Sequence, residues 1–189
     1  MAGKPGDVMV MIWDWKQGGV FGPAHSVGHA ALAVRDDKRG WRIVQSQFPH
    51  EPGGKSKIEG PNVLISNPRD LLKEEGGKPD TAFLVMVPDL GGLAIAAMAD
   101  LRKEIWHFDP GHHWESFATN CTYGIIRSLR AGGVPLKGMW ANQTLILPGS
   151  PYTPRDLRTA LDRETPFNAI HPFKIHHRND LIGQINWEQ

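Results

Sequence analysis

Cysteine occurs once in this chain of 189 residues, as Cys121. A single cysteine cannot form an internal disulfide, and a thiolate-based structural zinc site needs at least two cysteines. These facts exclude the small disulfide-stapled scaffolds and the zinc ribbons. An apolar core must hold the fold, and the chain is long enough to bury one. Three interpretations of Cys121 stay open: a buried inert residue, a chance surface residue, or a nucleophile.

The composition indicates a globular chain with many loops. Glycine and proline supply 21 and 15 of the residues, above their usual combined share of about 12%. Basic and acidic side chains are balanced at 21 and 20, which argues against a charged disordered protein and against a dedicated nucleic-acid binder. We expect one domain over residues 1–189, with a core at about 8–135 and a C-terminal extension at 136–189.

Neither a targeting segment nor a membrane span is evident. The apolar run at residues 8–13 is too short for the core of a signal peptide. The longest other run, at residues 90–99, falls well short of the about 20 residues that a membrane-spanning helix needs. We therefore expect a protein made in the cytoplasm without a signal peptide and without stable membrane insertion.

Apolar patterning predicts a mixture of strands and helices. Strands are expected at residues 8–13, 29–34, 41–48, 62–66 and 82–87. Helices are expected at residues 68–72, at 92–106, from Cys121 to the pair Gly132-Gly133, and at 154–161. The strands at 29–34 and 41–48 flank a charged turn that ends in glycine, which is typical of a hairpin. Asp89 is a candidate cap for the helix at 92–106.

Cys121 is the sharpest candidate for chemistry. Thr119 and Asn120 both suit an N-cap, which predicts that Cys121 is the first residue of its helix. The backbone N–H groups and the positive end of the helix dipole at such a position lower the pKa of a thiol from about 8.5. The alternative is a small apolar residue packed at a helix start.

A thiolate nucleophile needs a base, which is usually histidine. The chain has nine histidines, and most lie in polar segments, where a solvated surface position is the simpler interpretation. His29 differs because it opens an apolar strand, Gly28-His29-Ala30-Ala31-Leu32, whose small neighbours allow close approach.

We expect no cofactor and no metal. His112-His113-x-Glu115 and the pair His176-His177 do not match a recognised zinc-ligand spacing. The Gly-Gly pairs follow neither the dinucleotide-binding nor the Walker pattern. The Gly-x-Ser-x-Gly elbow of serine hydrolases is absent.

Two segments carry a resemblance: SVGHAALAV…WRIVQSQFP and, further along the chain, WESFATNCTYGIIRSLRAGG. In this order they resemble the circularly permuted papain-like hydrolases, relatives of the NlpC-type peptidoglycan peptidases in which the histidine strand precedes the cysteine helix. That branch includes lecithin–retinol acyltransferase-like proteins and bacterial toxins delivered by type VI secretion. The strand end Ser46-Gln47-Phe48-Pro49 is similar to that of the toxins. The resemblance covers about residues 8–135.

The resemblance implies an α+β, papain-like (permuted NlpC-like) fold, with an antiparallel sheet packed against the nucleophile helix. It implies Cys121 as the nucleophile and His29 as the general base. The third, orienting residue usually lies on the strand after the histidine strand, where many relatives have Glu, Asp or His and this chain has Gln45, Ser46 and Gln47. Ser46 is the first choice from the Ser-x-Phe-Pro match, and Gln45 the second. Alternate residues of a strand face opposite sides, so only one of the two can orient the imidazole.

The activity implied is that of a cysteine peptidase or amidase. The expected substrate is the peptide portion of peptidoglycan, cleaved by an antibacterial effector that a type VI-like system delivers to the periplasm of a target cell. An immunity protein and a secretion-apparatus protein would be its partners. One alternative keeps the dyad but acts on lipid acyl groups, as a hydrolase or acyltransferase, or on proteins, as a protease or deamidase. Another is a non-catalytic binding module.

Overall fold

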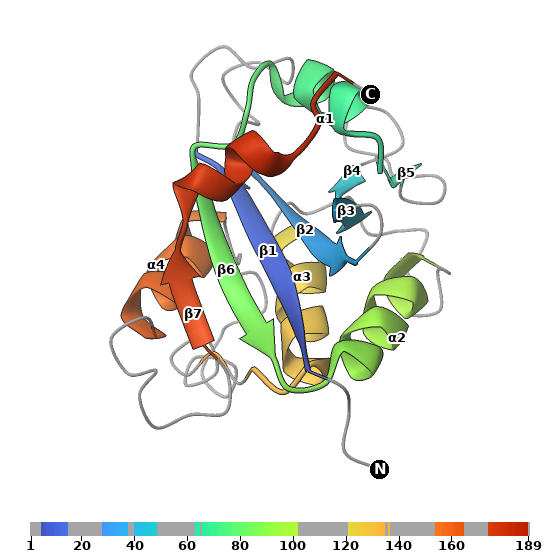
Figure 1. Ribbon diagram of the computed structural model, residues 1–189, viewed down its shortest axis with the longest axis vertical. Helices are drawn as coiled ribbons and strands as arrows, with labels where there is room; N and C mark the ends of the chain where they lie inside the picture. Colours follow the sequence, from blue (N-terminus) through green and yellow to red (C-terminus); the bar gives the residue numbers. More distant parts are fainter. Residues whose placement is uncertain are drawn as a thin grey trace, which may run out of the picture.

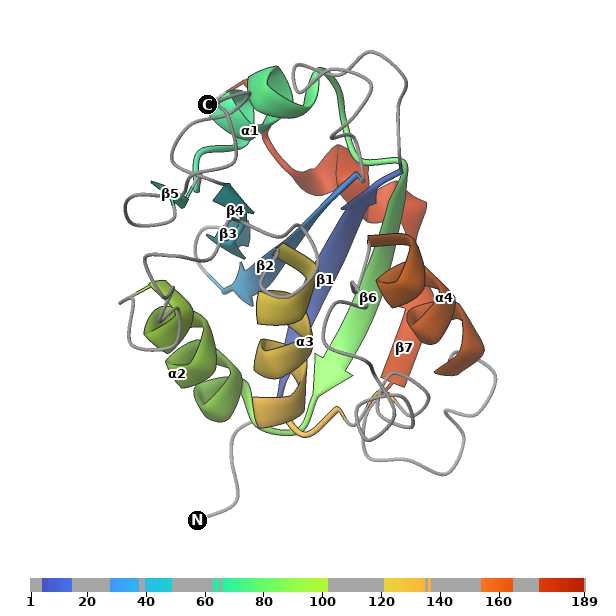
Figure 2. The same ribbon diagram turned by 180° about the vertical axis from the view of Figure 1, so that it is seen from behind.

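The structure is a computed structural model of the whole chain. It describes residues 5–14, 28–37, 40–48, 63–64, 66–101, 121–134, 136, 154–164 and 174–188. Within these ranges the chain is α+β: a five-stranded antiparallel sheet carries helices on both faces (Figures 1 and 2). The α+β class predicted from the sequence is confirmed at this level.

The central sheet has the strand order β3-β2-β1-β6-β7. Its strands are β1 (Gly6–Trp13), β2 (His29–Asp36), β3 (Gly40–Gln45), β6 (Thr81–Val87) and β7 (Lys174–His177), and every neighbouring pair is antiparallel. The predicted hairpin is present as β2 and β3, but β3 ends at Gln45, and residues 47–48 of the predicted strand 41–48 belong to a second sheet. Strand β1 lies in the middle, and its residues from Val8 to Ile12 are fully buried. A strand covered on both faces has no polar side, which is why β1 is a continuous apolar run.

The two faces of the sheet have different covers. One face packs on α2 (Leu90–Leu101), α3 (Cys121–Ala131) and α4 (Pro154–Glu164). The other packs on α1 (Pro68–Glu75) and the 3-10 helix η2 (Asn179–Gln184). Figure 2 shows α2, α3 and α4 on the first face, whereas Figure 1 is seen from the side of α1 and η2. A small second sheet pairs β4 (Gln47–Phe48) with β5 (Val63–Leu64).

Local signals place the ends of the helices. The backbone N–H of Gly92 donates to Asp89 Oδ1 at 2.9 Å, so Asp89 caps α2 as predicted, although the helix begins at Leu90 and is described only as far as Leu101. Helix α3 is described from Cys121 onward. Its predicted caps, Thr119 and Asn120, lie outside the described residues.

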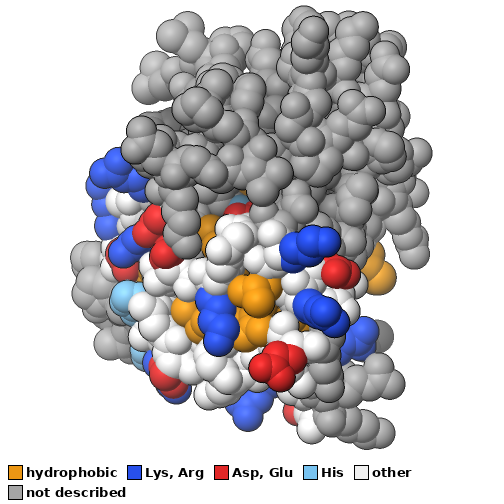
Figure 3. All heavy atoms as spheres, turned by 90° about the horizontal axis from the view of Figure 1, so that it is seen from above, with side chains coloured by type: hydrophobic (Ala, Val, Ile, Leu, Met, Phe, Trp, Pro, Cys, Tyr) orange, Lys and Arg blue, Asp and Glu red, His pale blue; other side chains and the backbone are white. Residues whose placement is uncertain are grey.

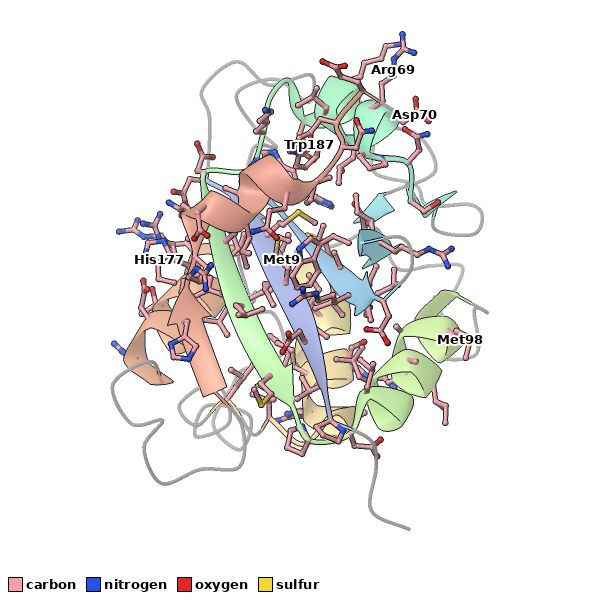
Figure 4. All side chains as sticks on the ribbon, viewed as in Figure 1. Met9, Arg69, Asp70, Met98, His177 and Trp187 are labelled. Carbon is pink, nitrogen blue, oxygen red and sulfur yellow. The ribbon has the colours of Figure 1, made fainter. Side chains whose placement is uncertain are left out.

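The C-terminal part of the chain completes the sheet. Strand β7 pairs with β6, and Ile175, Leu181 and Trp187 are buried in the core. Figure 4 shows Met9 and Trp187 on the same side of the sheet. Sequence patterning predicted neither β7 nor η2, because only Ile175 of β7 is a buried apolar residue. His176 and His177 are exposed, in keeping with the solvated surface expected for them.

Candidate active site

His29 is the first residue of β2, and its side chain is buried. It pairs with Trp13 of β1, and the two rings lie 5.7 Å apart between centroids. Ala31 and Ala33 belong to the apolar cluster on the α1 side of the sheet. Because side chains alternate along a strand, His29 points to the same side. The imidazole therefore lies between the sheet and α1, with 5% of the residue exposed.

A β-bulge in β3 decides which residue reaches His29. Ala33 pairs with Ile43, but the next residue of β2, Leu32, pairs with Gln45. Val44 is thus an extra residue that has no partner of its own on β2. Bulges of this kind re-aim the side chains that follow them, and they recur beside active sites.

The bulge turns Ser46, and not Gln45, toward the histidine. In a regular register Gln45 would share the face of His29, whereas the extra residue shifts Gln45 to the α3 face. There Gln45 Oε1 accepts a hydrogen bond from the Ser128 hydroxyl at 2.9 Å. Ser46 is fully buried, and its Oγ lies 2.9 Å from His29 Nε2. Of the two candidates for the orienting residue, Ser46 has the geometry to hold the imidazole.

Cys121 lies at the N-terminal end of the described part of α3. It is partly buried against the face of the sheet that α2, α3 and α4 cover. Its sulfur has a backbone hydrogen-bond contact with Ala30, the residue after His29. Thr122 Oγ1 lies 4.0 Å from Sγ. Cys121 therefore contacts the backbone of β2 next to His29 from the α3 side of the sheet, whereas the imidazole lies on the α1 side.

The pKa of Cys121 corrects one expectation. The helix start was expected to lower the pKa of the thiol, but burial raises it to about 11. The backbone hydrogen bonds of Ala30 and Thr122 act in the opposite direction, and the negative charge of Glu75 raises the pKa further. Loss of hydration outweighs the stabilisation that backbone N–H groups provide, because a thiolate is poorly solvated away from water.

The pKa of His29 is lowered to about 3 by burial. Near neutral pH the resting site therefore holds a neutral thiol and a neutral imidazole. A neutral imidazole can accept a proton from the thiol when the sulfur attacks a substrate.

Glu75 is a member of this site that sequence reasoning missed. It is the last residue of α1, and its Oε1 lies 3.8 Å from His29 Nδ1. One signal was available: a carboxylate at the C-terminal end of a helix is opposed by the helix dipole. A residue that breaks such a local rule is a candidate for a functional role.

The described ranges contain no cluster of three or more His, Cys, Asp or Glu side chains that could hold a metal ion. His112, His113 and Glu115 lie outside those ranges. In the same ranges, no helix is both long enough and apolar enough to cross a membrane.

The surface at the α1 end of the molecule is mixed in charge. Figure 3 shows basic and acidic side chains interspersed around a small apolar area. Arg69, Asp70 and Lys73 of α1 are exposed, and Figure 4 shows Arg69 and Asp70 pointing away from the sheet.

No family model, curated protein or solved structure matches this chain.

Proposed function

We propose that this protein is a papain-like cysteine hydrolase of the permuted NlpC-like kind. Cys121 is the nucleophile, His29 is the general base, and Ser46 orients the imidazole. The observation that carries the proposal is the 2.9 Å contact between His29 Nε2 and Ser46 Oγ, at the residue next to Ala30, whose backbone contacts the Cys121 sulfur. A nucleophile, a base and a group that orients the base are the parts that covalent catalysis needs.

The neutral resting state fits a mechanism in which the proton moves during the attack. The Cys121 sulfur bonds to the substrate carbonyl carbon while His29 takes the thiol proton. The imidazolium then gives that proton to the leaving amine, which departs and leaves a thioester. His29 next removes a proton from water, which attacks the thioester carbon. The carbon–sulfur bond then breaks, the acid leaves, and the imidazolium returns its proton to the Cys121 sulfur. The backbone N–H of Cys121 is one candidate donor to the oxyanion.

The proposed substrate is the peptide portion of peptidoglycan, and the proposed role is that of an antibacterial effector delivered to the periplasm of a target cell by a type VI-like system. The support for this choice is the Ser46-Gln47-Phe48-Pro49 match to the toxin branch. Such an effector would have an immunity protein that blocks its site and a secretion-apparatus protein that loads it.

The first experiment is digestion of purified peptidoglycan sacculi, with the products identified by mass spectrometry. The wild type is expected to release muropeptide fragments, and Cys121→Ala is expected to lose at least about 1,000-fold in rate, as happens when a catalytic nucleophile is removed. Met98→Ala is the matched control, because Met98 is exposed on α2 and points away from the sheet (Figure 4).

Two outcomes would contradict this proposal in different ways. Equal cleavage by Cys121→Ala and wild type would remove the nucleophile from the mechanism. Intact sacculi after treatment with folded wild type would remove the cell-wall substrate, and phospholipid vesicles and proteins would then be tested with the same pair of variants.

A further inference from the structure

The carboxylate of Glu75 is held against His29 in a poorly hydrated place. Its side chain is 12% exposed, and the facing His29 side chain is 6% exposed. The distance from Oε1 to Nδ1 is 3.8 Å, which exceeds the usual length of a hydrogen bond. At this distance a neutral imidazole gains little from the carboxylate, whereas an imidazolium is attracted strongly because few waters screen the charges.

The end of α1 is fixed in place, so the position of Glu75 is defined. Leu71, one turn earlier, is fully buried in the cluster on this face. Gly76 ends the helix in the left-handed conformation, at a φ of 67°. The Trp13 indole N–H then donates to the Gly77 carbonyl at 2.8 Å. Trp13 also contacts the His29 ring, so one residue supports both members of the pair.

The charge of Glu75 has opposite effects on the two reacting groups. It disfavours a thiolate at Cys121, whose pKa it raises, and it favours an imidazolium at His29. In the resting site neither group is charged. After the attack, the sulfur is bonded to carbon and uncharged, while His29 carries the proton. The interaction with Glu75 is then favourable, so it strengthens between the ground state and the transition state, as catalysis requires.

We propose that Glu75 is a positioning residue of the site, which holds His29 from the side opposite Ser46 and stabilises it while it carries the proton of Cys121. This inference rests on the proposed function. The ionisable groups concerned come from three elements: Glu75 from α1, His29 from β2 and Cys121 from α3. Ser46, which also contacts His29, is uncharged.

The test measures two properties of Glu75→Gln. The pH dependence of Cys121 alkylation by iodoacetamide reports the pKa of the thiol without any substrate. Steady-state hydrolysis of a soluble muropeptide reports kcat and KM. We expect the alkylation curve of the variant to move to lower pH, so that labelling at pH 8 is faster than in the wild type. We expect kcat to fall by about 10- to 100-fold, as for other losses of positioning, with a smaller change in KM.

Two further variants distinguish the effect of the Glu75 charge from a structural effect of replacing the side chain. Asp70→Asn removes the same charge from an exposed position of α1 and is expected to change neither property. Glu75→Asp keeps the charge on a shorter side chain. We expect its thiol pKa to stay close to that of the wild type, and its kcat to lie between those of Glu75→Gln and the wild type. A purely structural role for Glu75 would give slower turnover without faster alkylation.

The outcomes are decisive in both directions. Faster alkylation together with a lower kcat in Glu75→Gln supports the proposal. An unchanged kcat, or an alkylation curve that stays in place or moves to higher pH, overturns it. If Glu75→Gln does not fold, Glu75→Met replaces it in both assays, and the same results support or overturn the proposal. If the wild type hydrolyses nothing, the proposed function fails, whereas the alkylation curves still decide whether Glu75 acts on Cys121.

Discussion

At the scale of single residues, the site depends on which of two neighbours faces His29. Ser46 contacts the imidazole, and Gln45 contacts Ser128 on the other side of the sheet. Both contacts are buried, so each has a measurable effect on stability. Only the contact of Ser46 involves a residue of the proposed mechanism.

Ser46→Ala should therefore lower both activity and stability, whereas Gln45→Ala should lower mainly stability. Ser46→Ala removes the partner of His29 Nε2, and we expect kcat to fall by about 10- to 100-fold. Its free energy of unfolding should fall by about 1–3 kcal/mol, because a buried ring nitrogen loses the Ser46 hydroxyl. Gln45→Ala leaves the Ser128 hydroxyl buried without Gln45 Oε1, which should cost about 1–3 kcal/mol of stability and little activity per folded molecule. Denaturant unfolding measures the change in stability of each variant, and steady-state kinetics measure the change in kcat. The reverse pattern would assign the orienting role to Gln45.

At the scale of elements, α2 lies unusually close to the end of α3. A Cβ on Gly92 would overlap the Ala131 carbonyl oxygen, so only glycine fits at this contact. The backbone N–H of Asp89 also donates to the Gly132 carbonyl at 3.0 Å. The contact anchors the C-terminal end of α3, the helix that carries Cys121 at its other end.

Gly92→Ala is expected to lower the free energy of unfolding by about 1–3 kcal/mol, because the helices must move apart to accept the methyl group. Gly91→Ala is the matched control. A Cβ there meets one side-chain oxygen, Asp89 Oδ1, at 3.3 Å, and alanine suits a helix better than glycine. Thermal unfolding of the two variants compares them directly. Equal stability would show that α2 and α3 can separate without cost.

At the scale of the whole molecule, the central strand carries a core on both faces, and His29 is buried and Cys121 partly buried at one end of it. Burial keeps both groups neutral, but unfolding returns them to water. The stability of the fold therefore depends on pH at both ends of the range.

On the acid side, unfolded His29 takes up a proton near pH 6.5, whereas the folded residue does so near pH 3. The unfolded state binds more protons in this window, so the free energy of unfolding should fall as the pH drops from 6.5 to 3, by up to about 4–5 kcal/mol. On the alkaline side, the thiol ionises near pH 9 when unfolded and near pH 11 when folded. Stability should therefore fall again as the pH rises through that window.

Denaturant unfolding across pH, compared between wild type and His29→Gln, isolates the histidine from the carboxylates that titrate in the same range. The difference in free energy of unfolding between wild type and His29→Gln should shrink as the pH falls below 6.5. His176→Gln, at an exposed position of β7, is the matched control and should follow the wild type. A constant difference between wild type and His29→Gln would contradict the neutral buried imidazole.

The sequence by itself determined most of the elements, with β7 and η2 as the exceptions. Strands β1 and β6 are apolar runs, α2 follows its cap at Asp89, and α3 covers the predicted stretch from Cys121. Each of these depends on residues within a few positions of one another, so local patterning and capping are enough to predict them. The candidates His29, Ser46 and Cys121 were also found in the sequence.

Only the tertiary structure decided how these elements form a site. The bulge at Val44 turned Ser46 toward His29, and α1 brought Glu75 beside the imidazole from a segment far along the chain. Burial raised the pKa of Cys121, although its position at a helix start predicted the opposite. Side-chain facing depends on register between strands, and hydration depends on every element packed around a group. Neither the facing of a side chain nor its hydration is set by neighbours in the sequence, so both could be determined only from the tertiary structure.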